Sequence, residues 1–262
     1  MSHDNGLIRR LKDGGTAICL PIRISRSAHI LHMARAAGFD SIYVDMQQSD
    51  VSIADVGQLC QAAWGADITP LVRVPELDTH IIGRVLDGGA GGIIVPYVHT
   101  VEMAKTAVDA VRFAPRGSRS GAGAGLSTGY AGGKKAEQAL DQQTLLIAMI
   151  ESTTAVNNVA AIAAVDGIDM LFVGTGDLSR ELGVHGDPHH PKIYEAFEQV
   201  AKACRQHNRW LGVAGIKGAS AAQTLGALHK LGARFISART EEALLVAATR
   251  DEATMLREIF KS

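Results

Sequence analysis

Short apolar runs recur along the chain, and each is followed by a segment with a helical pattern. The runs are nearly continuous in Val, Ile, Leu and Ala and do not alternate with polar residues. Continuous patterning indicates strands buried on both faces, as in a parallel sheet that helices cover. The predicted strands are residues 17–22, 41–46, 69–74, 92–98, 145–151, 170–177, 210–216 and 235–240.

The segments between these strands predict helices. In one of them Asp78 stands where an N-cap is needed and Gly88 where the helix should stop. The predicted helices are residues 27–37, 52–65, 78–89, 100–113, 153–165, 192–208, 219–232 and 240–260. Eight strand–helix units in 262 residues are what a (β/α)8 barrel requires, so we expect an α/β protein with one TIM barrel domain over residues 1–262. An open, doubly wound sheet is the alternative, which the count of eight disfavours.

A segment rich in Gly and Ser, residues 116–135, departs from this pattern. Its seven glycines argue against a regular element, so we expect a loop between the fourth helix and the fifth strand. It is not a phosphate-binding loop, because it lacks the GKS or GKT ending and does not follow a strand directly. Two interpretations stay open: a segment that reaches an active site or crosses to another subunit, and a loop that is merely flexible.

Composition and charge limit the classes of partner. The chain carries 26 Lys and Arg against 27 Asp and Glu, which gives no electrostatic indication of nucleic acid or membrane binding. Cys19, Cys60 and Cys204 fit neither a zinc spacing nor a disulfide framework and are typical of reduced, buried cysteines. The N-terminus is too polar for a signal peptide, and no apolar run is long enough for a membrane span. We therefore expect a cytoplasmic protein that acts on small molecules.

Two carboxylates follow directly after predicted strands. Glu151 and Asp177 end neighbouring apolar runs, and the carboxyl ends of barrel strands are where active sites form. Two carboxylates there can share one hard cation such as Mg²⁺ or Mn²⁺ and leave positions open for substrate oxygens. The alternative is that each caps the helix after it, with Asp177 as an N-cap.

Arg73 ends an otherwise apolar strand and needs an anionic partner, because a buried, unpaired guanidinium is costly. That partner is either a substrate carboxylate or enolate, or an internal acid such as Asp45. The sixth strand ends in a turn whose free backbone N–H groups could receive a carboxylate, although a tight turn that simply needs glycine is also consistent. The turn consists of Gly174, Thr175, Gly176 and Asp177.

The histidines form no metal-binding set of the HxxxH or HExxH type on a predicted helix. His189 and His190 fall in a polar stretch between prolines and are expected in a solvated loop. His29 and His32 are expected to be packing or surface residues of the first predicted helix. His99 is the exception, because it follows the fourth strand on the face where catalytic residues gather.

Seven motifs occur along nearly the whole chain in a characteristic order. They are GFDSIYVDMQQS at 38–49, PLVRVP at 70–75, VLDGGAGGIIVPYV at 85–98, APRGSRS at 114–120, AMIES at 148–152, VDGIDMLFVGTGDLS at 165–179 and LGARFIS at 231–237. In this order and spacing, the chain resembles the HpcH/HpaI family of metal-dependent class II pyruvate aldolases.

The resemblance implies a metal-dependent barrel that adds the enolate of pyruvate or a related 2-keto acid to an aldehyde, or runs the reverse cleavage. It also implies a homo-oligomer, a trimer or hexamer, and a divalent metal: Mg²⁺ or Mn²⁺, with Co²⁺ and Zn²⁺ as alternatives. The resemblance also implies residue roles. Glu151 and Asp177 match the metal ligands, Arg73 matches the enolate-stabilising arginine, and Gly176 and Asp177 fall in the loop that receives the keto acid's carboxylate. Asp45 matches the residue that supports the catalytic base, and Asp87 matches a residue at a subunit contact.

One position departs from the family pattern. After the second strand the family reads D-x-E-H, whereas this chain has Asp45-Met46-Gln47-Gln48. Gln48 therefore occupies the place of the histidine, and glutamine does not titrate near neutral pH. Loss of a general base typically lowers a rate by about 10²–10⁴.

Three functions remain as hypotheses. The first is an aldolase that joins a 2-keto acid to an aldehyde. Gln48 would position a water or the acceptor, and a metal-bound water or His99 would transfer the proton. The second uses oxaloacetate, either in decarboxylation or in a citrate-forming condensation with acetyl-CoA, an acyl acceptor, in siderophore biosynthesis. The third is a keto-acid-binding relative without catalysis.

Overall fold

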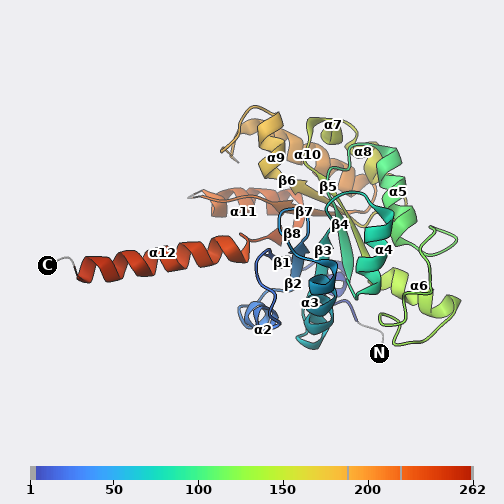
Figure 1. Cartoon of the computed structure of the whole chain (residues 1–262). Coiled ribbons are helices and arrows are strands. Elements are labelled where there is room, and N and C mark those ends of the chain that lie inside the picture. The colour runs from blue at the N-terminus through green and yellow to red at the C-terminus, as the bar shows by residue number, and fades with distance from the viewer. Residues whose placement is uncertain (1–3, 188, 219, 261–262) are drawn as a thin grey trace.

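The computed structural model describes residues 4–187, 189–218 and 220–260, and its centre is a closed barrel of parallel strands (Figure 1). Each strand pairs with the next one along the chain, and the last pairs with the first. The strands are β1 (Ala17–Ile22), β2 (Ser41–Asp45), β3 (Thr69–Arg73), β4 (Gly92–Val95), β5 (Leu145–Ile150), β6 (Met170–Gly174), β7 (Trp210–Ala214) and β8 (Ala233–Ser237). The predicted barrel is confirmed, and the open sheet was the wrong alternative.

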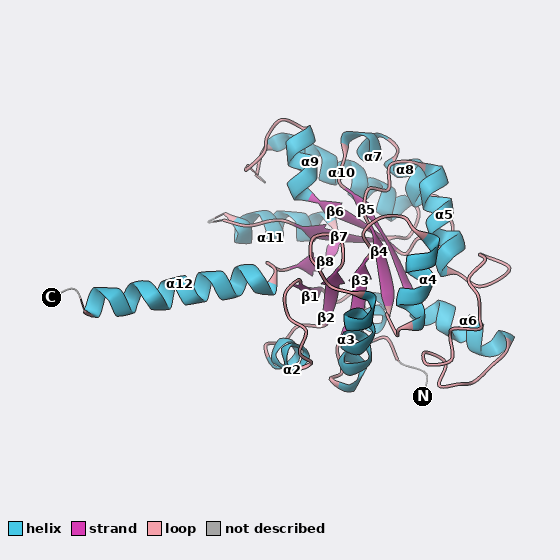
Figure 2. Ribbon diagram, viewed as in Figure 1, coloured by secondary structure: helices cyan, strands magenta, loops and turns pink. Residues whose placement is uncertain are grey.

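Helices surround the barrel (Figure 2). In the described ranges they are α1 (Gly6–Lys12), α2 (His29–Ala36), α3 (Ile53–Gly65), α4 (Thr79–Asp87), α5 (Val101–Val111), α6 (Lys134–Gln143), α7 (Thr153–Asn157), α8 (Val159–Ala163), α9 (Thr175–Glu181), α10 (Pro191–Gln206), α11 (Ala221–Leu231) and α12 (Glu241–Ile259). The helix predicted at 153–165 is divided into α7 and α8, and α1 and α6 were not predicted. The strand predicted at 170–177 ends at Gly174, and its last three residues begin α9. None of the described helices is both long and apolar enough to cross a membrane.

Helix α1 closes the N-terminal end of the barrel. Leu7, Ile8 and Leu11 are buried and belong to the same apolar cluster as the barrel interior. Asn5 caps the helix by accepting from the Ile8 amide, and its side-chain amide donates to the carbonyl of Gly91 at 3.1 Å. An Asn followed by apolar residues at helical spacing could have predicted this helix. The polar residues around them made that pattern hard to recognise.

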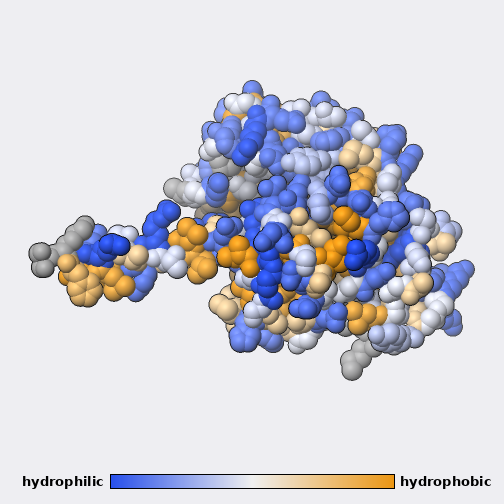
Figure 3. Space-filling view, viewed as in Figure 1, coloured by the Kyte–Doolittle hydropathy of each residue, from blue (hydrophilic) through white to orange (hydrophobic). Residues whose placement is uncertain are grey.

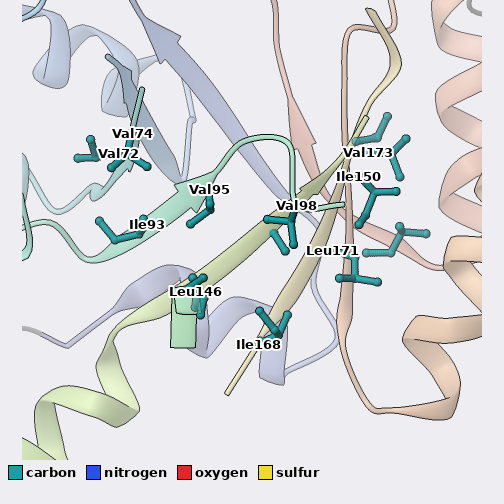
Figure 4. Packing of buried hydrophobic residues seen from close by; sticks show 14 of the residues in the cluster. Val72, Val74, Ile93, Val95, Val98, Leu146, Ile150, Ile168, Leu171 and Val173 are labelled. Carbon is teal, nitrogen blue, oxygen red and sulfur yellow. The ribbon is translucent and has the colours of Figure 1, made fainter. Parts of the chain in front are cut away.

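Side chains along each strand point alternately into the barrel and toward the helices. The inward set forms one apolar cluster, which includes Cys19, Tyr43, Leu71, Ile147, Phe172 and Phe235. The outward set, together with apolar residues next to the strand ends, belongs to a second cluster that includes residues of the helices. Figure 4 shows part of this cluster: Val72, Val74, Ile93, Val95, Val98, Leu146, Ile150, Ile168, Leu171 and Val173. Burial on both faces explains why the strands read as continuous apolar runs.

The alternation also decides which residues face the C-terminal mouth of the barrel. Two positions beyond Tyr43, Leu71, Met149 and Phe172 come Asp45, Arg73, Glu151 and Gly174. The strand register sets Asp45 beside Arg73 and pairs Ile150 with Val173, so Glu151 and Gly174 follow on neighbouring strands. Polar groups therefore begin where the apolar interior ends.

The Gly-rich segment contains neither helix nor strand up to α6, which begins at Lys134. It packs against the end of α4, where the Ser127 hydroxyl donates to the Leu86 carbonyl and Arg119 contacts Asp87 at 3.3 Å. The end of α4 lies at the N-terminal face of the barrel. Within this chain the segment therefore does not reach the C-terminal mouth, and Asp87 pairs with an arginine of the same chain.

Helix α12 leaves the barrel and projects away from it (Figures 1 and 2). Only Glu241, in its first turn, is buried. Apolar side chains along the rest are exposed, and Figure 3 shows them gathered on the projecting helix. The exposed large side chains are Leu245, Val246, Met255, Leu256 and Ile259, with Phe260 after the helix.

We expect Gly92→Ala to destabilise the barrel, because a Cβ there would lie 2.7 Å from the Leu145 Cβ and 2.8 Å from the Leu71 Cδ2. The expected loss in the free energy of unfolding is about 1–3 kcal/mol. The matched control is Gly83→Ala in helix α4, where a Cβ meets no atom within 4 Å. It should gain about 0.5–1 kcal/mol. Urea unfolding of both variants checks this, and equal effects would contradict the close packing at Gly92.

Candidate active site

A cavity of about 360 Å³ opens at the C-terminal mouth of the barrel. Arg73, Glu151 and residues 174–177 line it together, although they come from β3, from the residue after β5, and from the junction of β6 with α9. The structure thus brings together the predicted metal ligands, the predicted arginine and the predicted carboxylate-binding turn.

A larger cavity, about 720 Å³, lies at the N-terminal end, but six of the seven charged side chains that line it, all except Asp13, are already paired. They form ion pairs: Arg9 with Asp4, Arg10 with Asp40, and Arg35 with Asp67. Barrel enzymes carry their chemistry at the C-terminal ends of the strands. The smaller cavity is therefore the candidate active site.

Asp45 and Arg73 form a buried, two-point ion pair beneath this cavity. The Arg73 Nε donates to Asp45 Oδ1 at 2.8 Å, and Nη2 donates to Oδ2 at 2.6 Å. Arg23 adds a third contact at 2.8 Å to the same Oδ2. Burial acts to raise the pKa of Asp45, but the hydrogen bonds and charges of Arg73 and then Arg23 lower it below its usual value. The salt bridge proposed as the alternative partner for Arg73 is thus present, and the guanidinium still lines the cavity.

This pairing leaves part of the guanidinium available. The one hydrogen-bond acceptor of Arg73 Nη1 among the described residues is the Met149 sulfur, at 3.9 Å. A sulfur is a weak acceptor, so Nη1 retains donor capacity that a substrate oxygen could use. Asp45 therefore fixes the orientation of Arg73 without consuming all of its donors.

Glu151 is buried, and no described Lys, Arg or His lies within ion-pair distance of it. Its side chain is 2% exposed, and its Oε1 accepts from the Tyr97 amide at 2.9 Å. Burial raises the pKa of Glu151 to about 7; the Tyr97 amide and Arg73 oppose the rise, and Asp177 adds to it. An ionised carboxylate in this position is costly unless a cation neutralises it.

Tyr97 joins the two carboxylates and was not predicted. Its amide contacts Glu151, and its hydroxyl donates to Asp177 Oδ2 at 3.4 Å. This geometry requires a left-handed backbone at Tyr97, with φ of 51°. The sequence does not predict this left-handed conformation, because a tyrosine rarely adopts it.

The turn after β6 places Asp177 near Glu151. Helix α9 begins at Thr175 with Gly174 as its N-cap residue, so Asp177 lies within the first turn and the interpretation of Asp177 as the N-cap was wrong. The Thr175 hydroxyl donates to the Ala214 carbonyl at 2.6 Å and ties the turn to β7. A Cβ at Gly174 would lie 2.7 Å from Glu151 Oε2, so glycine is needed for the carboxylate to lie against β6.

Gln48 and His99 do not line the cavity. The Gln48 side chain is exposed, and its backbone amide donates to Asp45 Oδ1 at 3.2 Å. His99 Nδ1 lies 2.7 Å from the Ser152 hydroxyl, and its ring is tilted against Tyr97. Their roles in proton transfer and acceptor positioning stay predictions.

The donor set at the cavity fits a divalent cation. Glu151 and Asp177 supply carboxylate oxygens, which Mg²⁺ and Mn²⁺ prefer. The nearby charge of Arg73 only partly offsets the burial of Glu151, whose pKa stays raised. No group of three or more His, Cys, Asp or Glu side chains suited to a metal occurs in the described ranges. A cation held by two carboxylates keeps most of its positions for small ligands, which is typical of a catalytic site.

Comparison with known proteins identifies the class. The model of the HpcH/HpaI aldolase/citrate lyase family matches residues 24–236, and the chain belongs to this family. Its fold and its family thus define it as an aldolase-type lyase.

Named relatives share about a third of the sequence. The 4-hydroxy-4-methyl-2-oxoglutarate aldolase of Hapsidospora irregularis is 34% identical over 249 residues, which cover 94% of this chain and 92% of that protein. The 2-keto-3-deoxy-L-rhamnonate aldolase of Klebsiella pneumoniae is 34% identical, covering 93% and 90%. A crystal structure of an HpcH/HpaI aldolase from Desulfitobacterium hafniense superposes with a TM-score of 0.88 at 26% identity, covering 95% and 96%. The citrate synthase SbnG, with a TM-score of 0.87 at 23% identity and coverage of 99% and 100%, shares the fold.

We expect Glu151→Gln to stabilise the metal-free protein above pH 7. With a raised native pKa of about 7, Glu151 makes the wild type less stable as pH rises from about 4.5 to 7, because only the unfolded state ionises freely there. Glutamine removes this penalty, so the variant should exceed the wild type by about 1–3 kcal/mol at pH 8. The advantage should shrink toward pH 5.

Urea unfolding in EDTA at pH 5 and pH 8 measures this difference. The control is Glu198→Gln on the exposed side of α10. A stability difference for Glu151→Gln that does not change with pH would show that the native carboxyl titrates normally.

Proposed function

We propose that the protein is a divalent-metal-dependent aldolase that acts through the enolate of pyruvate or a related 2-keto acid. The observation that carries the proposal is the juxtaposition of an unneutralised, buried Glu151 with Asp177 and with a pre-oriented Arg73 in one cavity. A carboxylate pair and an arginine are what a site needs to bind a cation and to stabilise a developing oxyanion. The names of the relatives support the keto acid as the substrate class.

Glu151 and Asp177 would hold the metal, which when bound polarises the ketone of the keto acid. Arg73 stabilises the negative charge of the enolate with the donors that Asp45 leaves free. Asp45 keeps the guanidinium in place, so little reorganisation is needed as charge develops. The backbone of residues 174–177 is proposed to receive the keto acid's carboxylate.

A second candidate is decarboxylation of oxaloacetate. No histidine lines the cavity within the described residues, and exposed Gln48 stands in the position of the family's base. Loss of CO₂ from oxaloacetate yields the pyruvate enolate without removal of a proton from carbon. The residues that are proposed to bind the metal and to stabilise the enolate, Glu151, Asp177 and Arg73, are therefore sufficient for this reaction. Condensation with acetyl-CoA has less support, because its citrate synthase neighbour shares only the fold.

We expect the Mg²⁺- or Mn²⁺-loaded protein to release pyruvate from 4-hydroxy-4-methyl-2-oxoglutarate and from oxaloacetate, and EDTA to abolish both reactions. Arg73→Lys should lower both rates by about 10²–10³, because lysine cannot hold two contacts to Asp45 and still offer a directed donor. Glu151→Gln should raise the metal dissociation constant, measured by titration calorimetry. Pyruvate release is followed with a coupled enzyme.

The exposed Glu198→Gln serves again as the control and should behave as wild type. Cleavage at wild-type rate in EDTA would contradict the metal-dependent mechanism. Decarboxylation without aldol cleavage would favour the second candidate, and keto acid binding without any turnover would favour a binder without catalysis.

We also propose that the protein is a homo-oligomer, a trimer or hexamer, in which α12 packs on a neighbouring copy. Its apolar side is exposed along the projecting helix, and apolar residues are also exposed on the barrel near β1, namely Ile18, Ile24 and Met33. Exposed apolar surface on this scale is typical of an interaction site. Helix α12 contacts its own barrel chiefly at β1, so most of its length is free to pack on another copy.

Leu256→Glu should reduce the mass measured by light scattering after size-exclusion chromatography, because a charge would enter the apolar contact. Thr254→Glu, two residues earlier and on the opposite side of the helix, is the control. A monomeric wild type would contradict the proposed assembly.

A further inference from the structure

Asp177 is loosely held for a residue that is proposed to bind a metal. Its side chain is 44% exposed, and it stands in the first turn of the short helix α9. Within the described ranges two side chains contact its carboxylate: the Tyr97 hydroxyl at 3.4 Å and Arg180 Nε at 4.0 Å. Arg180 belongs to the same short helix and is itself exposed. Tyr97 is therefore the contact that connects Asp177 to another part of the barrel.

Tyr97 makes this contact from an unfavourable backbone conformation. In the described ranges the non-glycine residues with a left-handed backbone are Asp67, Tyr97, Tyr130 and Asn208. Asp and Asn tolerate this conformation, whereas a tyrosine adopts it at a cost in stability. Tyr130 lies exposed in the Gly-rich segment, but Tyr97 lies between β4 and α5, beside both predicted metal ligands. A costly conformation in such a place indicates a functional reason for it.

The contacts of Tyr97 connect the two carboxylates. Its amide donates to Glu151 Oε1 at 2.9 Å, and its hydroxyl donates to Asp177. Its ring lies against the ring of His99, with 5.9 Å between the centroids. His99 Nδ1 in turn lies 2.7 Å from the hydroxyl of Ser152, the residue after Glu151. The direction of the tyrosine side chain is thus supported from the β5 side.

We propose that Tyr97 is a positioning residue of the metal site, and that its left-handed backbone is retained because it fixes Glu151 and Asp177 relative to each other. This inference rests on the proposed function and adds a residue that prepares its metal site. Hydrogen bonds from neighbouring groups orient metal ligands, so a restrained Asp177 has less freedom to lose when the cation binds. Tyr97 does not line the cavity, so it acts through the two carboxylates.

The test measures Mn²⁺ binding to the full-length, metal-free protein without any substrate. Electron paramagnetic resonance of free Mn²⁺ and titration calorimetry give the Kd, and urea unfolding in EDTA gives the stability of the same samples. Tyr97→Phe removes the hydroxyl alone. Tyr97→Asn removes it and also introduces a residue that favours the left-handed backbone. Both variants keep the backbone amide that contacts Glu151.

We expect Tyr97→Phe to raise the Kd for Mn²⁺ about 10-fold, because a metal ligand loses its hydrogen-bond partner. The urea midpoint should change little, because this side chain is 38% exposed. Tyr97→Asn should raise the Kd to a similar extent and also raise the urea midpoint, because the backbone cost is relieved. A merely structural role would not combine weaker metal binding with higher stability.

The matched control is Tyr194→Phe on α10, which removes a hydroxyl that donates to Thr224 at 3.1 Å and lies outside the cavity. It should bind Mn²⁺ as the wild type does. Wild-type Mn²⁺ affinity in Tyr97→Phe would overturn the inference, as would a urea midpoint of Tyr97→Asn no higher than that of the wild type.

Glu151→Gln separates this inference from the proposed function. If the wild type does not bind Mn²⁺, or if Glu151→Gln binds it equally well, the proposed metal site fails and the inference fails with it. If Glu151→Gln weakens binding and Tyr97→Phe does not, the inference alone fails.

Discussion

The ion pair of Asp45 and Arg73 is the constraint on which the rest of the site depends. Both side chains point into the barrel one layer above its apolar interior, where neither charge would be tolerated alone. Their two-point contact fixes the plane of the guanidinium. The same carboxylate accepts from the amides of Gln47 and Gln48, so the loop after β2 takes its course from this pair. Structure and proposed chemistry therefore share one pair of charges.

Glu151 shows the opposite arrangement at the same height in the barrel. Asp45 has two arginines and a lowered pKa, whereas Glu151 has a backbone amide and a raised pKa. The two acids differ because two arginines pair with Asp45, whereas no described cation forms an ion pair with Glu151. This contrast, more than the number of acidic residues, distinguishes the proposed metal ligand from a structural carboxylate.

The sequence predicted the barrel and most of the site because both follow from periodicity. Continuous apolar runs revealed the eight strands, and the polar residues at their ends included Arg73, Glu151 and Asp177. Features set by three-dimensional contacts could not be predicted in this way. The left-handed Tyr97 that links the carboxylates contradicts the usual backbone preference of a tyrosine. The short α1 was not predicted because polar residues surround its three buried apolar positions.

The layering of the barrel has a consequence for how this chemistry can change in evolution. Position 48 lies on a loop, its side chain is exposed, and exchange of histidine for glutamine there leaves the core and the buried ion pair untouched. Substitution of Asp45 or Arg73, in contrast, would leave a buried charge without its partner and destabilise the folded protein. Barrels built in this way can lose or regain an acid–base group by a single codon change, so their proton transfer diverges sooner than their enolate stabilisation.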